Sequence, residues 1–490
     1  MKNKLKLKIV VSMILVIFAT CIALSSSLAI INTSRYMPID VSVWVNVAKQ
    51  MDEGKIIYRD IFDHKGPIIY FLYYIGYKID GTLGIWLIHY ITVLIDIFVI
   101  YNISKRILKD TKKSLLIIGI SSVFLALLSG INSETPCTES IALTFILISL
   151  YNFMKFNISN NIFSKKESLI TGICLGIVLL LRPNTIPLWV VYYLYIFIKC
   201  VKEKKIKKLL KIVFFSFLGL FIIAIPVIFY LYINGAINAF WEIYLIFNLK
   251  YSSIREANLL ETISYFTIKT NYTILIIFLI YVLYLAYIKI NKKTKDDTLL
   301  VNFIYFILTI IIVIMPRRLY LHYSIIILPS IIYPLILITK NIKINFKIYI
   351  FCYTISIIIT ILLSIFNCLF LKKIKESEYY LNYKDYIQNC TTKEDNILVL
   401  GNETYIYIFF DREYKGKYFY QIPIALFDEK IAEEIIAEIK EDEPKLIIKD
   451  KNYKFIFEYT KFYYEIEKIL DKYYSTEDQM IYKKIDINNK

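Results

Sequence analysis

The longest polar passage in the first third of this sequence is residues 39–67, IDVSVWVNVAKQMDEGKIIYRDIFDHKGP. The chain is 57% hydrophobic, so a charged segment directly after a long apolar stretch calls for a functional explanation. Asp40 begins the segment, and a carboxylate there could act as a general base that accepts the proton of an acceptor hydroxyl. The alternative is that Asp40 caps the helix predicted to follow it, because Asp is favoured at helix N-termini.

The other end of this segment carries Asp63, His64 and Lys65 directly before a Gly-Pro turn. The carboxylate and imidazole could hold a sugar or a metal ion, and the lysine could pair with a phosphate. The alternative is a solvated polar loop. One histidine beside two acids is not a specific metal spacing, so no cofactor is certain. A divalent metal ion is left open, with Asp63 and His64 as its expected ligands.

Further charges lie where apolar runs end or break. Glu139 would begin a helix, where its charge suits the helix dipole, but it could also assist a base at Asp40. Arg182 interrupts an apolar run at an Arg-Pro-Asn sequence, and an arginine at membrane depth usually has a partner. Arg318 and His322 lie within RRLYLHY. Arginine suits bidentate phosphate contact, although Arg318 could instead extend to lipid head groups.

The composition defines the class of protein that positions these residues. Apolar runs of about 20 residues, each long enough to cross a bilayer, recur along the chain and predict a polytopic membrane protein. The net charge of +17 comes largely from lysines in short loops between these runs, so we expect no nucleic-acid partner. The seven cysteines form no CxxC pair, which argues against a disulfide framework and against a zinc site.

The charge pattern predicts a topology of about eleven transmembrane helices. Lysines at the N-terminus place it in the cytoplasm, and the first external loop then covers about residues 32–81. Within this loop, residues 66–80 are too short to span a bilayer and predict an interfacial or re-entrant helix. Every predicted cytoplasmic loop is lysine-rich, as expected for a multi-pass protein of the cell membrane.

The composition changes near residue 372. We therefore predict a transmembrane domain over residues 1–371 and a small external α/β domain over residues 372–490. In the second domain NILVLG and KLIIKD predict buried strands, and FDEKIAEEIIAEIKEDEP predicts an amphipathic helix. This domain has no glycine-rich phosphate loop, so we expect it to bind or scaffold rather than to catalyse.

Several motifs occur together in this order. They are Asp40 after the first helix, the string ending in DHKGP at 54–67, TES at 138–140, LRPN at 181–184, RRLYLHY at 317–323 ahead of Pro329, and LVLGNETYIY, KYFYQIP and EPKLII near the C-terminus. Over nearly the whole chain this pattern resembles the GT-C glycosyltransferases of the protein O-mannosyltransferase and aminoarabinose transferase superfamily. In particular, it resembles the bacterial dolichyl-phosphate-mannose-protein-mannosyltransferase-like members. The DHKGP string is the most specific of these motifs.

The resemblance implies a polyprenyl-phosphate sugar as donor and inverting transfer to an extracytoplasmic glycolipid, wall polymer or protein. It implies Asp40 as the base and Glu139 as its assistant. Asp40 is followed by Val41, so the Asp-Glu pair that is frequent in the family is absent. The residues expected to bind donor phosphate or substrate are Asp63, His64, Lys65, Arg182, Arg318 and His322.

Two other functions are compatible with the same pattern. A transporter or flippase of polyprenyl-linked glycans would share the helices and charges, but it would need no essential external carboxylate. A non-catalytic scaffold of envelope assembly would tolerate the loss of Asp40, Asp63 and Glu139 together. The convergence of acidic and basic groups on one predicted face favours the transferase.

Overall fold

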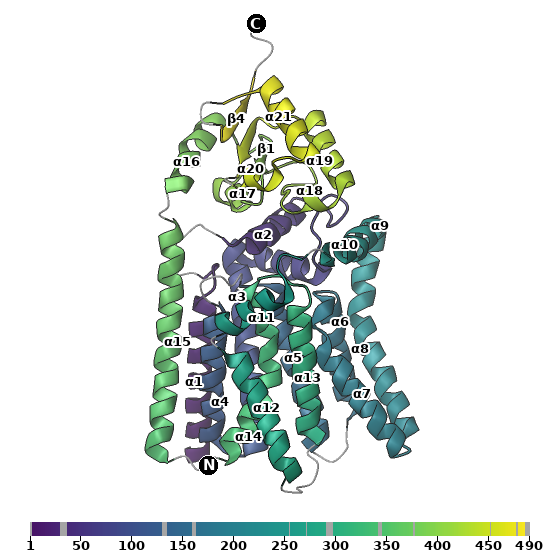
Figure 1. The fold of residues 1–490 in the computed structure, drawn as a ribbon, viewed down its shortest axis with the longest axis vertical. Helices are drawn as coiled ribbons and strands as arrows, with labels where there is room; N and C mark the ends of the chain where they lie inside the picture. Colours follow the sequence, from purple (N-terminus) through teal and green to yellow (C-terminus); the bar gives the residue numbers. More distant parts are fainter. Residues whose placement is uncertain are drawn as a thin grey trace.

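The computed structural model of the chain describes residues 2–29, 37–129, 135–158, 163–253, 255–270, 272–290, 297–341, 345–375, 378–450, 452–476 and 479–485. Long helices form a bundle, and the C-terminal residues form a smaller part above one end of it (Figure 1). Helix α1 (Lys2–Leu24) begins at the opposite end of the bundle. The start of the predicted first loop, residues 32–36, lies outside the described residues.

The described helices establish a multi-pass membrane protein. Seven segments are long and apolar enough to cross a bilayer, and a bent pair, α11 (Leu259–Lys269) with α12 (Thr273–Ile290), could make an eighth. The predicted count of about eleven spans is therefore not confirmed. The seven are α1, α3 (Pro67–Leu108), α4 (Thr111–Ser129), α8 (Ile206–Ile233), α13 (Asp297–Ile314), η3 (Leu321–Ile327) with α14 (Leu328–Asn341), and α15 (Phe346–Lys375).

Helix α3 consists of two arms that meet at Asp80 and Gly81, both of which have non-helical backbone angles. The first arm corresponds to the short helix expected in residues 66–80. The arms fold closely together, because a Cβ at Gly84 would lie 1.9 Å from the carbonyl oxygen of Gly76. The break therefore separates the first arm, residues 67–80, from the long helix that follows it.

Helix α2 (Ile39–Asp52) lies across the top of the bundle (Figure 1). The side chains of Val41, Trp44, Val45 and Ala48 are fully buried and fix its orientation. The alternative prediction that Asp40 is the N-cap residue of this helix is wrong, because Pro38 is the N-cap residue and Asp40 lies in the first turn. A carboxylate in the first turn still suits the helix dipole.

Helices α6 (Lys165–Leu179) and α7 (Pro187–Lys202) are separated by the short helix η1 (Pro183–Thr185). The break expected at the Arg-Pro-Asn sequence is thus confirmed. Helix α6 packs closely on α8, where a Cβ at Gly172 would lie 2.0 Å from a backbone oxygen of Ser216. Helix α5 (Thr138–Ile158) packs against α3 and α6.

The C-terminal part contains a four-stranded sheet in the order β1-β2-β4-β3. Strands β1 (Ile397–Leu400) and β2 (Leu446–Lys449) are parallel and fully buried, as expected from NILVLG and KLIIKD. Strand β4 (Ile481–Lys484) pairs antiparallel with β2 and with β3 (Tyr474–Ser475). The helices of this part are α16 (Glu378–Cys390), α17 (Tyr405–Phe410), α18 (Ile424–Phe427), α19 (Glu429–Glu441), α20 (Tyr453–Phe457) and α21 (Lys461–Tyr473).

The amphipathic helix expected in this part is α19, and its buried face carries Ile431, Ile435, Ile436 and Ile439. The division of the chain into domains at residue 371 stays a prediction. The C-terminal part is joined to α2 by buried hydrogen bonds. Ser42 Oγ lies 2.7 Å from Thr404 Oγ1, and Asn46 donates to the Thr404 carbonyl oxygen at 2.8 Å.

Candidate active site

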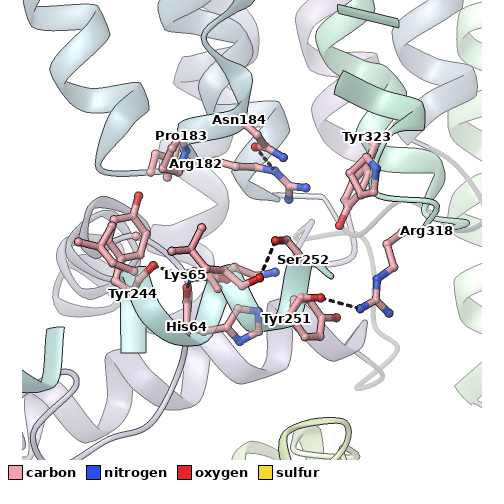
Figure 2. A pocket seen from close by; sticks show the side chains of 16 residues that line it. His64, Lys65, Arg182, Pro183, Asn184, Tyr244, Tyr251, Ser252, Arg318 and Tyr323 are labelled. Carbon is pink, nitrogen blue, oxygen red and sulfur yellow. Dashed lines mark hydrogen bonds between the residues drawn. The ribbon is translucent and has the colours of Figure 1, made fainter. Parts of the chain in front are cut away.

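A cavity of about 380 Å³ lies at the end of the bundle that faces the C-terminal part. Its walls come from four regions of the sequence, namely the first loop, the break after α6, the segment 244–252 and the segment 316–323, which includes the start of η3. Basic side chains from three of these regions face it (Figure 2). The lining residues that the sequence analysis singled out are His64, Lys65, Arg182 and Arg318.

Gly66 explains why DHKGP lies beside LRPN. A Cβ at Gly66 would lie 2.2 Å from the carbonyl oxygen of Leu180, so only glycine allows the two backbones to approach this closely. The same Leu180 oxygen accepts a hydrogen bond from the Ile68 amide at 3.1 Å. This contact places Lys65 and Arg182 on the same cavity wall.

Lys65 connects the cavity to Asp40. Its Nζ lies 3.6 Å from Asp40 Oδ2, and its carbonyl oxygen accepts a hydrogen bond from Tyr58 at 2.7 Å. Burial alone would lower the pKa of Lys65, but Asp40, Tyr323 and Asp63 together outweigh it and raise the pKa above the ordinary lysine value. Lys65 therefore carries its charge at the cavity, with Asp40 on its other side.

Arg182 pairs with Glu139, which is almost fully buried at the start of α5. The guanidinium also lies 4.2 Å from the ring centre of Tyr323 and donates from Nε to Asn184 at 3.0 Å. His322 Nε2 lies 3.8 Å from the same Glu139 oxygen. Glu139 thus lies between Arg182 and His322, and the partner expected for a buried Arg182 is present.

Arg318 forms the third cationic contact of the cavity. Its guanidinium pairs with Glu256 and stacks on the Tyr251 ring, with Cζ 4.4 Å from the ring centre. The side chain is 5% exposed, so the alternative in which it extends to lipid head groups is wrong. Arg318 is directed toward the cavity instead (Figure 2).

Asp63 does not line the cavity. Its two oxygens accept hydrogen bonds from Tyr70 and Tyr420, each at 2.8 Å, and Oδ1 also accepts from the His64 amide at 2.9 Å. Burial raises the pKa of Asp63 above its usual value, although Lys65 opposes this effect. Asp63 therefore shapes the loop, and its orientation does not fit contact with a substrate in this cavity.

His64 contacts the rings of Phe247 and Tyr251 and lines the cavity. Burial, reinforced by Lys65, lowers the pKa of His64 to about 3, so its imidazole is neutral near pH 7. The expected metal ligands do not fit a metal ion well, because hydrogen bonds already occupy both Asp63 oxygens. Within the described ranges, no group of three or more metal-ligating side chains occurs.

The cavity wall that sequence reasoning missed comes from residues 241–252. The π-helix η2 (Trp241–Phe247) and helix α10 (Asn248–Ser252) present Tyr244, Asn248 and Tyr251 to the cavity. Asn248 Nδ2 donates to the His64 carbonyl oxygen at 2.6 Å and so attaches this wall to the first loop. The sequence signal for this wall is the spacing of Tyr244, Asn248 and Tyr251, which are four and three residues apart and so lie on one face of a helix.

The expected site residues thus fall into two groups. His64, Lys65, Arg182 and Arg318 line the cavity, whereas Asp63 and His322 lie behind its surface. Asp40 and Glu139 are not among the lining residues and are counter-ions of Lys65 and Arg182, but they differ in exposure, because the Asp40 side chain is 32% exposed and that of Glu139 is 1% exposed. The structure therefore brings three cations to one cavity, and each has a carboxylate partner. Their roles in chemistry stay predictions.

The apolar helices and the fold define a multi-pass membrane protein with a cationic cavity at one end of the bundle. The structure resembles that of ArnT from Cupriavidus metallidurans bound to undecaprenyl phosphate, with a TM-score of 0.65 and 8% identity over 99% of this chain and 98% of that chain. It also resembles the apo state of ArnT from the same organism, with a TM-score of 0.62 and 9% identity over 98% of each chain. At this identity the likeness shows a shared fold.

The chain belongs to the family described as the competence-induced protein Ccs4 N-terminal domain, whose family profile matches residues 1–353. This match covers the first loop, the three cationic contacts of the cavity and the helical bundle as far as the start of α15. No curated protein matches the sequence.

Proposed function

We propose that this chain is a membrane glycosyltransferase that transfers a sugar from a polyprenyl-phosphate donor to an extracytoplasmic acceptor. The observation that carries the proposal is the cavity in which Lys65, Arg182 and Arg318 converge beside Asp40. A cavity with three cations and several aromatic side chains suits a lipid phosphate that carries a sugar. The ArnT structure of the same fold is bound to undecaprenyl phosphate, which supports this ligand class.

In the proposed reaction, Asp40 accepts the proton of an acceptor hydroxyl as the hydroxyl oxygen attacks the anomeric carbon. The bond between that carbon and the phosphate oxygen breaks, and the electron pair leaves with the lipid phosphate. The three cations stabilise the charge on this leaving group. Attack opposite to the leaving group inverts the anomeric configuration. Glu139 contributes by holding Arg182 in place.

The proposed topology puts the cavity and the C-terminal part on the outer face of the cell membrane. The start of α1 and the lysine-rich loops then lie in the cytoplasm, as the positive-inside rule requires. The acceptor is a glycolipid, a wall polymer or a protein. We also propose the relation to the mannosyltransferase-like members of the superfamily, on the strength of the DHKGP motif at the cavity.

The proposal is tested by incubating membranes that contain the full chain with polyprenyl-phosphate sugars and analysing lipids, wall polymers and proteins by mass spectrometry. We expect Asp40→Asn to reduce transfer by about 10²- to 10⁴-fold, the usual contribution of a general base. Asp52→Asn is the matched control, because Asp52 lies at the other end of α2 and pairs with Lys78.

Full transfer by Asp40→Asn would remove Asp40 from the mechanism. Movement of the lipid-linked glycan across the bilayer without transfer would favour the transporter alternative. A wild-type phenotype for a variant that lacks the carboxylates of Asp40, Asp63 and Glu139 would favour the scaffold.

A further inference from the structure

Glu256 contacts the cavity cation Arg318 although it was not among the expected site residues. Its carboxylate pairs with the Arg318 guanidinium and accepts a hydrogen bond from Tyr320 at 3.1 Å. The Glu256 amide donates to the carbonyl oxygen of Arg317 at 3.2 Å. Backbone and side chain together therefore hold this carboxylate over a cation that faces the cavity.

The carboxylates behind Arg182 and Arg318 differ in their surroundings. The side chain of Glu139 is 1% exposed and is enclosed in the bundle, where it could not separate from Arg182 without leaving a charge unpaired in the protein. The side chain of Glu256 is 36% exposed and lies in the connection between α10 and α11. Glu256 can therefore turn into water at a low energetic cost, whereas Glu139 cannot.

Arg318 needs an anionic partner whether or not a ligand is present, because it is almost fully buried. The Tyr251 ring supports one face of its guanidinium, which keeps it directed at the cavity when the partner changes. A phosphate in the cavity would offer stronger, bidentate contacts than a partly exposed carboxylate. Phosphate and Glu256 would then compete for one guanidinium.

We propose that Glu256 is an exchangeable counter-ion that occupies Arg318 until a lipid phosphate replaces it. In the empty cavity Glu256 thereby keeps the Arg318 guanidinium in position. A ligand must compete with the Glu256 carboxylate, so only a strongly anionic ligand can replace it. This inference rests on the proposed function, because it requires a lipid phosphate as the ligand. It assigns to Glu256 a role in selecting the ligand.

The test uses the purified full chain and measures binding of undecaprenyl phosphate to wild type, Glu256→Gln, Arg318→Gln and the double variant. Glu256→Gln keeps the size of the side chain and removes its charge, so we expect binding to tighten by about two- to fivefold, as for a partly exposed ion pair. Arg318→Gln should weaken binding, and Glu256→Gln should give no gain in its background. Glu261→Gln is the control, because Glu261 caps α11 with Asn258.

Unchanged or weaker binding by Glu256→Gln, with wild type binding normally, would overturn the inference and leave the proposed function intact. An equal gain in the Arg318→Gln background would also overturn it, because Glu256 would then act by general repulsion. Absence of undecaprenyl phosphate binding in every variant would overturn the proposed function and the inference together.

Discussion

The hydroxyl of Tyr420 donates a hydrogen bond to Asp63 Oδ1 at 2.8 Å, across 357 positions of sequence. Both groups are buried, and Tyr70 donates to the other oxygen of the same carboxylate. The C-terminal part therefore fixes the conformation of the loop that ends at Lys65. A second hydrogen bond joins the same loop to the C-terminal part. The amide of Phe62 donates to the carbonyl oxygen of Lys417 at 3.0 Å.

Tyr420→Phe removes this hydroxyl with little change in volume. It leaves Asp63 with one fewer donor, and a lost hydrogen bond to a buried carboxylate costs about 1–3 kcal/mol. We expect a lower unfolding temperature and weaker undecaprenyl phosphate binding, because Lys65 lies two residues from Asp63. Tyr418→Phe is the control, since the Tyr418 hydroxyl contacts Glu434 within the C-terminal part. Equal effects of the two variants on lipid binding would contradict the prediction.

Thr404 holds α2, the helix that begins beside Asp40. Thr404→Val removes the hydroxyl that pairs with Ser42 but keeps the carbonyl oxygen that Asn46 uses. If α2 positions the base, the variant should lower kcat about tenfold and leave undecaprenyl phosphate binding unchanged. Thr404→Ser restores a hydroxyl and should recover the rate. A loss of kcat that Thr404→Ser does not rescue would contradict the prediction. It would show that the methyl group of Thr404, which serine lacks, is needed instead.

Gly66→Ala tests the contact between the first loop and the break after α6. The new methyl group would overlap the Leu180 carbonyl oxygen, so the loop must move away from Arg182. Overpacking of this kind typically costs about 1–3 kcal/mol. We expect reduced thermal stability together with a loss of lipid phosphate affinity. A stable variant with unchanged affinity would show that the two backbones need not meet here.

The junction between α2 and the C-terminal part should weaken as the pH rises. Burial and the neighbouring Glu413 raise the pKa of Glu53 from 4.5 to about 7. A carboxyl whose folded pKa is raised contributes its full stability below the unfolded pKa and loses it as the pH rises through the folded pKa. The unfolding temperature should therefore fall as the pH rises from about 4.5 to about 7, between the unfolded and folded pKa values of Glu53. Glu53→Gln should reduce this dependence, whereas Asp52→Asn should leave it unchanged.

The sequence predicted the membrane class, the break at Arg182 and the buried strands β1 and β2 because each depends on local pattern. It also predicted that Lys65, Arg182 and Arg318 belong together, since they border apolar runs that end on one side of the bilayer. It did not predict Glu256 or Tyr251, because their contacts depend on how a π-helical segment turns toward the cavity. Nor did it separate Asp63 from the lining, because its partner Tyr420 lies in a distant part of the chain.

The contact between Tyr420 and Asp63 also has a consequence for biosynthesis. The first loop leaves the ribosome long before residue 420 is made, and during that interval Asp63 lacks the Tyr420 hydroxyl that holds it in the finished protein. The bundle can insert helix by helix, but the loop that ends at Lys65 gains this support only after residue 420 has been made. Completion of the site is therefore one of the last events in the synthesis of this chain.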